Sequence, residues 1–72
     1  MMIPEIIESS EQQSFSDGHV CGITHRLYRW NGSEDMIVHV GWVKYPNGSV
    51  VESRDFGDEE FAKTWIISTL RK

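Results

Sequence analysis

The chain has 72 residues, a net charge of −4 and a single cysteine, Cys21. A chain of this length can bury one small hydrophobic core, and a lone cysteine excludes an internal disulfide and favours a reducing compartment. No segment approaches the roughly 18 apolar residues of a membrane-spanning helix and the first residues lack the pattern of a signal peptide, so we expect a cytoplasmic protein with no membrane partner.

The acidic charge is concentrated at the start of the sequence. Residues 1–18 contain four acidic residues and no Lys or Arg, whereas residues 19–72 contain seven acidic and seven basic residues. We therefore divide the chain into an acidic N-terminal arm (1–18) and a neutral domain (19–72). This balance provides no strongly basic surface for phosphate groups, so a nucleic-acid partner is not expected.

The N-terminal arm has weak structural signals. Pro4 suits the first position of a short helix over residues 5–8, and the isoleucines of the arm have the spacing of one helical face. Residues 9–18 are polar and are typical of a linker. We expect the arm either to be flexible or to dock on the domain through its isoleucines.

Three strands are predicted in the domain from runs of β-branched and aromatic residues. They cover residues 19–30, 36–45 and 49–56, with a turn at residues 31–35 between the first two. The clearest turn is Pro-Asn-Gly at residues 46–48, because proline suits its first corner and glycine its left-handed position. These signals predict an antiparallel meander.

The short turn also predicts how the second and third strands pair. It places Val43 opposite Val51. Val38 and Trp42 lie on the other face of the same strand, which is richer in large apolar side chains. We therefore expect the face with Val38 and Trp42 to contact the helix.

A C-terminal helix is predicted after Asp58, which suits the N-cap position. Its apolar stripe consists of Phe61, Ala62, Trp65, Ile66, Thr69 and Leu70. The predicted fold class is α+β: a three- to four-stranded antiparallel β-meander packed against one C-terminal helix (β-β-β-α), with a flexible or docking N-terminal arm.

The histidines do not form a predicted catalytic or metal site. His19 and His25 are six residues apart on one strand, about 20 Å, which is too far to share an ion. His39 is expected opposite Asp55, where a cross-strand hydrogen bond explains the pair better than catalysis. The sequence also lacks a phosphate-binding loop or dinucleotide motif. We therefore expect no enzyme activity, no cofactor and no metal ion.

One helix covers only one face of a sheet, so the opposite face is the predicted binding surface. Its mixture of aromatic, arginine and aliphatic side chains is typical of interface cores. The residues predicted to bind a partner are Arg26, Tyr28, Trp30, Val43 and Tyr45. Alternatively, the N-terminal arm covers this face with its isoleucines.

Two other functions are compatible with the same fold. A three-stranded sheet followed by a helix resembles the small DNA-binding domains of some tyrosine recombinases, which would use Arg26, Arg29, Lys44 and Arg54. The low positive charge argues against this function. The other alternative is a homodimer joined through the open sheet face, which would compensate for the small core.

A further pattern is carried by Tyr28, by the Asn-Gly pairs at 31–32 and 47–48, by Ser-Arg-Asp-Phe at 53–56, and by Glu60-Phe61 followed by Trp65. In these features residues 19–66 resemble a family of small phage anti-CRISPR proteins of the type I-F inhibitor kind. The resemblance implies an antiparallel sheet backed by helices. It also implies that the protein binds Cas proteins in the backbone of a bacterial surveillance complex and blocks target DNA.

Only Tyr28 matches a contact tyrosine of that family, since its other contact tyrosine has no counterpart in this sequence. The leading hypothesis is therefore a non-enzymatic inhibitor, phage-encoded and acting in the host bacterial cytoplasm, that binds a bacterial protein complex through its open sheet face.

Overall fold

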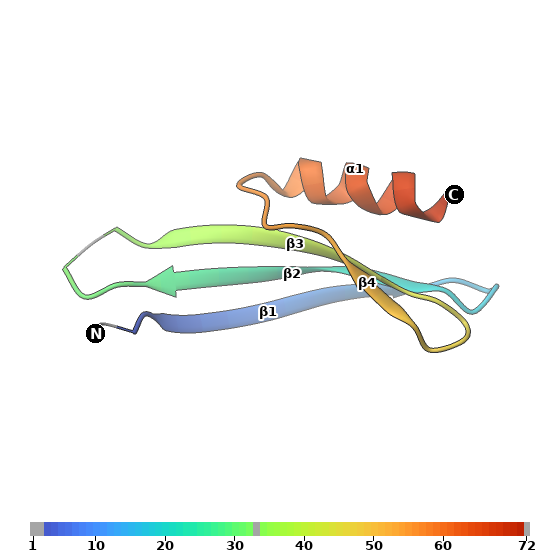
Figure 1. Cartoon of the computed structure of the whole chain (residues 1–72), viewed down its shortest axis with the longest axis horizontal. Coiled ribbons are helices and arrows are strands. Elements are labelled where there is room, and N and C mark those ends of the chain that lie inside the picture. Colours follow the sequence, from blue (N-terminus) through green and yellow to red (C-terminus); the bar gives the residue numbers. More distant parts are fainter. Residues whose placement is uncertain (1–2, 33, 72) are drawn as a thin grey trace.

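The computed structural model describes residues 3–32 and 34–71 and contains one antiparallel sheet followed by one helix (Figure 1). The elements are β1 (Glu5–Ser14), β2 (Val20–Arg29), β3 (Met36–Lys44), β4 (Val50–Glu52) and α1 (Glu59–Leu70). The strands lie in sequence order, so the predicted α+β meander with one C-terminal helix is confirmed. The turn predicted at residues 31–35 joins β2 to β3, although its Ser33 lies outside the described residues. Within the described residues, no helix is long and apolar enough to cross a membrane.

The N-terminal arm forms the first strand of the sheet. β1 pairs with β2 along its whole length, from Glu5 opposite Arg29 to Ser14 opposite Val20. The prediction of a short helix at residues 5–8 is therefore wrong, as is that of a linker from residue 9. The segment has few strand-favouring side chains, but a neighbouring strand that offers a full set of backbone partners overrides that weak preference.

Two turns of nearly identical form lie beside each other. In the turn between β1 and β2, Asp17 Oδ1 accepts a hydrogen bond from the backbone N–H of His19 (3.0 Å), and the intervening glycine has a φ of 95°. In the turn between β3 and β4, Asn47 Oδ1 accepts from the N–H of Ser49 (2.9 Å), and the intervening glycine has a φ of 93°. Glycine adopts this left-handed conformation without the steric cost that other residues incur.

The helix packs on the sheet face that carries the odd-numbered residues of β2 and β3. The buried cluster between the two layers consists of Cys21, Ile23, Val43, Ala62 and Ile66. Gly41 allows the helix to pack closely on this face, because a Cβ atom at that position would lie only 2.9 Å from the ring of Trp65. Because Gly41 has no side chain, α1 can approach the backbone of β3 closely at this position.

The prediction that Val38 and Trp42 contact the helix is wrong. Both side chains alternate with Gly41 and Val43 along β3, so they project from the opposite face. The larger side chains on that face would hold a helix away, whereas the glycine on the other face admits it.

The predicted pairing of β3 with β4 is correct only next to the turn. Val43 pairs with Val51 as expected. His39 pairs with Phe56 instead of Asp55. One additional residue lies between these two pairs on the returning chain, which shifts the register by one position as in a β-bulge.

The helix begins as predicted. Asp58 is the N-cap, and its Oδ1 accepts a hydrogen bond from the N–H of Glu60 (2.9 Å). Most of the predicted apolar stripe contacts the sheet, but Phe61 is 62% exposed. It lies at the margin of the contact, where its ring packs at 6.2 Å from that of Phe56.

The helix is much shorter than the strands that it covers. Twelve residues of helix span about 18 Å and ten residues of strand about 33 Å, and the molecule measures 46 × 21 × 18 Å. Figure 1 shows β1, β2 and β3 running past the start of α1 at the left. We call this part the free end; it comprises residues 3–7, 27–32 and 34–37.

Candidate binding surface

The candidate binding surface is the face of the sheet opposite α1, here called the open face. Even-numbered residues of β1, β2 and β3 project from it. Among the described residues, no helix or second layer of strands lies across it (Figure 1). β1 widens the sheet at its edge, so the alternative in which the arm covers this face is wrong.

Arg26 lies in the middle of the open face and is held by several neighbours. Its Nε donates to Glu8 Oε1 (2.8 Å), one of its terminal nitrogens lies 3.5 Å from the Tyr28 hydroxyl, and the same nitrogen lies 3.9 Å from Asp55 Oδ1. The hydrogen bonds to Tyr28 and Glu8 raise the pKa of Arg26. A guanidinium fixed in this way loses less conformational freedom when a partner binds.

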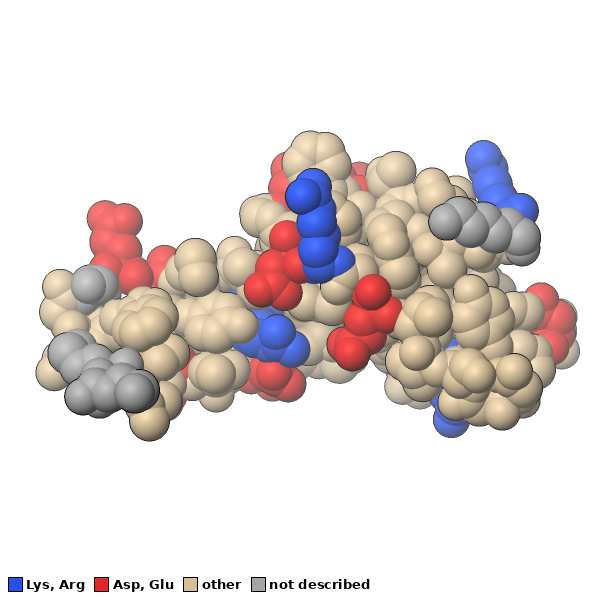
Figure 2. Space-filling model, viewed as in Figure 1, with Lys and Arg blue, Asp and Glu red and all other residues tan. Residues whose placement is uncertain are grey.

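Tyr28 is the central residue of a cross-strand row on this face. It pairs with Ile6 of β1 on one side and with Met36 of β3 on the other. Ile6 is 51% exposed and Met36 is 50% exposed, so the tyrosine is flanked by accessible apolar side chains. We call these three residues the Tyr28 row. In Figure 2 the left end of the molecule shows mainly uncharged side chains, with acidic side chains at its upper edge.

Trp42 forms the other aromatic part of the open face. Its indole crosses β2 above Gly22, where a Cβ atom would lie 2.6 Å from the ring, and its Nε1 donates to Ser10 Oγ on β1 (3.3 Å). The ring thus spans three strands and is half-buried. The glycine opposite this tryptophan is the sequence signal that could have assigned it to this face.

The open face is apolar beneath these side chains. Val38 and Val40 are buried although the helix lies on the other side of the sheet. Val38 pairs directly with Arg26, whose aliphatic stem can shield it while the guanidinium stays at the surface.

The structure brings together two of the five residues predicted to bind a partner. Arg26 and Tyr28 share the open face. Val43 is completely buried beneath α1, and Tyr45 packs against the same core, so their assignment to the open face is wrong. Both residues lie on the face where Gly41 leaves room for α1, so the helix covers them. Trp30 is half-buried just beyond the end of β2.

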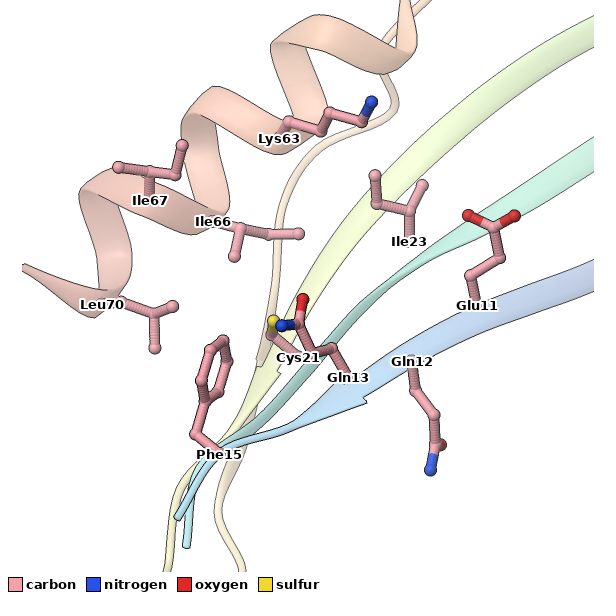
Figure 3. A pocket seen from close by; sticks show the side chains of 10 residues that line it. All are labelled: Glu11, Gln12, Gln13, Phe15, Cys21, Ile23, Lys63, Ile66, Ile67 and Leu70. Atoms are coloured by element: carbon pink, nitrogen blue, oxygen red, sulfur yellow. The ribbon is translucent and has the colours of Figure 1, made fainter. Parts of the chain in front are cut away.

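A separate groove lies on the other side of the sheet, between β1 and α1 (Figure 3). It arises because α1 covers β2 and β3 and leaves β1 uncovered. Its volume is about 440 Å³, and its apolar lining includes Phe15, Ile67 and Leu70. Cys21 lies at its base, where burial raises the pKa of the thiol and disfavours the reactive thiolate.

No family model matches this chain, and the comparisons with curated proteins and with solved structures found no match.

Proposed function

We propose that this protein is a non-enzymatic inhibitor that binds a folded protein partner through the open face. The observation that carries this proposal is the Tyr28 row, in which a half-buried tyrosine lies between two exposed apolar side chains. The row lies beside the fixed guanidinium of Arg26, on a face that no other described element covers. Tyrosine, methionine and arginine are among the residue types enriched at protein interfaces, and tyrosine and arginine are enriched among those that dominate binding energy.

The partner that the resemblance implies is a bacterial CRISPR surveillance complex of type I-F. Tyr28, the residue that matches a contact tyrosine of that inhibitor family, lies between two accessible apolar side chains. A tyrosine in such a position can insert its ring into an apolar pocket and keep its hydroxyl in a polar contact. This placement supports the same role for Tyr28 here.

The charges of the sheet favour a protein partner over DNA. Arg26 is paired with Glu8 (2.8 Å), and Arg29 lies 3.5 Å from Asp35. A phosphate backbone would have to compete with these carboxylates for two of the four cations that the DNA-binding alternative requires. The partner surface of a protein can instead use the existing pairs as polar contacts at the edge of an apolar centre.

The proposal can be tested with purified type I-F surveillance complex and the purified chain. Binding is measured by calorimetry, and the effect on target-DNA capture by gel mobility shift. Tyr28→Ala should weaken binding by at least about tenfold, since truncation of a central interface tyrosine commonly costs more than about 2 kcal/mol. Met36→Ala should weaken it by a smaller factor and, being half exposed, should leave folding intact.

Ile67→Ala is the matched control. Ile67 is as exposed as Ile6 (both 51%), but it borders the groove on the other side of the molecule. The proposal requires this variant to bind as tightly as the original chain. If Ile67→Ala and not Tyr28→Ala loses affinity, the groove is the binding site; if the original chain does not bind the complex, that partner is excluded.

A further inference from the structure

Four polar side chains meet on the helix-bearing face, near the start of α1. His25 of β2 pairs with His39 of β3, and their Nδ1 atoms are 2.7 Å apart. The other ring nitrogen of His25, Nε2, lies 3.7 Å from Glu11 Oε2 of β1 and 3.9 Å from Glu59 Oε1 of α1. The donor atoms of Glu11, His25 and Glu59 all lie within 4.8 Å of one another.

The hydrogen bond between the two imidazoles constrains their protons. At 2.7 Å one Nδ1 donates and the other accepts. When His25 is the donor in its neutral form, its Nε2 presents a lone pair toward the carboxylates of Glu11 and Glu59. Three electron-rich atoms then face one another at distances too long for direct hydrogen bonds, and a cation between them would stabilise this arrangement.

We propose that Glu11, His25 and Glu59 bind a divalent transition-metal ion of the Zn²⁺ type, with His39 as the residue that orients the His25 ring. Imidazole and carboxylate ligands suit such ions. A metal-bound histidine commonly donates its second N–H to a neighbouring group, as the His25–His39 contact allows. Water would supply the remaining ligand.

The distances are close to those that the ion requires. Zn²⁺ binds nitrogen and oxygen at about 2.0–2.2 Å in a tetrahedron, which places its ligand atoms about 3.4 Å apart. The two separations from His25 Nε2 exceed this value by 0.5 Å or less, and the carboxylate oxygens of Glu11 and Glu59 lie within 4.8 Å of each other. The Glu11 side chain is exposed and that of Glu59 is half-buried, with 77% and 39% of their surface accessible, so rotamer changes can bring their carboxylates closer to His25.

Such an ion would connect elements that otherwise make little contact. α1 packs on β2 and β3, and β1 pairs only with β2. A metal held by Glu11, His25 and Glu59 would join the edge strand directly to the helix. Domains of this size commonly depend on an additional cross-link of this kind for stability. The positive end of the helix dipole opposes a cation, and the acidic residues of the first turn offset that effect.

The test uses the full chain, treated with a chelator and then titrated with ZnCl₂. Calorimetry should show one ion per chain, and the melting temperature should rise by about 10 °C or more at a hundredfold excess of Zn²⁺ over its dissociation constant. Glu11→Gln and Glu59→Gln should each reduce the affinity at least tenfold without unfolding the chain. His39→Ala should reduce it about 10- to 100-fold, as expected of an orienting residue.

His19→Ala is the matched control, because His19 lies in the β1–β2 turn, 3.0 Å from Asp17, and is outside the cluster. It should bind Zn²⁺ like the original chain. The proposal is overturned if the original chain shows neither binding nor a melting shift, or if both glutamine variants bind Zn²⁺ normally. Loss of binding in His19→Ala alone would place the ion at the turn and would also overturn it.

Discussion

The two ends of the sheet have similar apolar patterns but very different burial. On the helix-bearing face of the covered end, Ile23 and Val43 are buried, the latter completely. On the same face at the free end, Ile37 is 55% exposed and Ile7 is 43% exposed. The difference arises because α1 reaches along only about half of the strands. On the helix-bearing face, burial is therefore set by how far the helix reaches along the strands.

This difference separates a covered end that stabilises the fold from a free end that we propose for recognition. The covered end contains the core cluster, so it should supply most of the free energy of folding. The free end exposes apolar groups on both faces and contains the Tyr28 row. Accessible apolar surface of this kind commonly marks an interaction site.

The largest expected effect tests this division directly. Val43→Ala should lower the free energy of unfolding by about 2–3 kcal/mol, because it removes two methyl groups from a completely buried site. Ile37→Ala removes more atoms but from an exposed site, so it should cost less than about 1 kcal/mol. Urea unfolding followed by circular dichroism gives both values. Equal losses in the two variants would mean that the free end is covered in solution, as in a dimer, and sedimentation would then show two chains.

A smaller loss of stability should follow when a side chain added at Gly41 displaces the helix from the sheet. Gly41→Ala places a Cβ atom 2.9 Å from the Trp65 ring and 3.1 Å from the carbonyl oxygen of Ala62, so α1 must shift. We expect a loss of about 1–3 kcal/mol in the free energy of unfolding. Gly57→Ala is the control, since no atom lies within 4 Å of its added Cβ, and it should change stability by less than about 0.5 kcal/mol. A harmless Gly41→Ala would show that α1 is not held by this close approach.

Local signals in the sequence were sufficient to predict the hairpin of β3 and β4 and the start of the helix. The turn at residues 46–48 and the N-cap Asp58 each act through contacts with residues two to four positions away. Such short-range chemistry can be recognised without knowledge of the rest of the fold. The same holds for the fold class, which follows from the order of these elements.

β1 was not predicted because its polar residues lack a strand pattern of their own. One signal was present: Asp17-Gly18 has the same form as Asn47-Gly48 and would have indicated a second hairpin. The face assignment failed for a different reason. Counting large apolar side chains favoured the side of Trp42, whereas the helix packs where Gly41 leaves room. The approach of Glu11 to His25 depends on the pairing of β1 with β2 and on the face that the helix covers, so the sequence did not reveal it.

The smallest effect concerns the two similar turns at the covered end. The hydrogen bond from the His19 backbone N–H, followed by the approach of the His19 ring Nδ1 to 3.0 Å from the carboxylate, lowers the pKa of Asp17 from its ordinary value of 3.8. A lowered pKa in the folded state means that the charged carboxylate contributes stability above its unfolded pKa. This contribution is lost as the pH falls through the folded value. Asn47 makes the equivalent hydrogen bond with an amide oxygen that does not titrate.

Asp17→Asn should therefore replace the carboxylate acceptor of the β1–β2 turn with an amide oxygen, as in the β3–β4 turn. Its melting temperature should lie slightly below that of the original chain at about pH 5, and this difference in melting temperature should shrink as the pH falls through the lowered pKa of Asp17. The converse variant, Asn47→Asp, should acquire a new loss of stability over the same interval, because its carboxylate would accept the Ser49 N–H. Melting curves recorded from about pH 5 downward for the original chain and the two variants measure both effects. The alternative outcome is a difference in melting temperature between Asp17→Asn and the original chain that does not change with pH. It would show that the charge of Asp17 adds no stability to this turn and that its oxygen acts only as a hydrogen-bond acceptor, like that of Asn47.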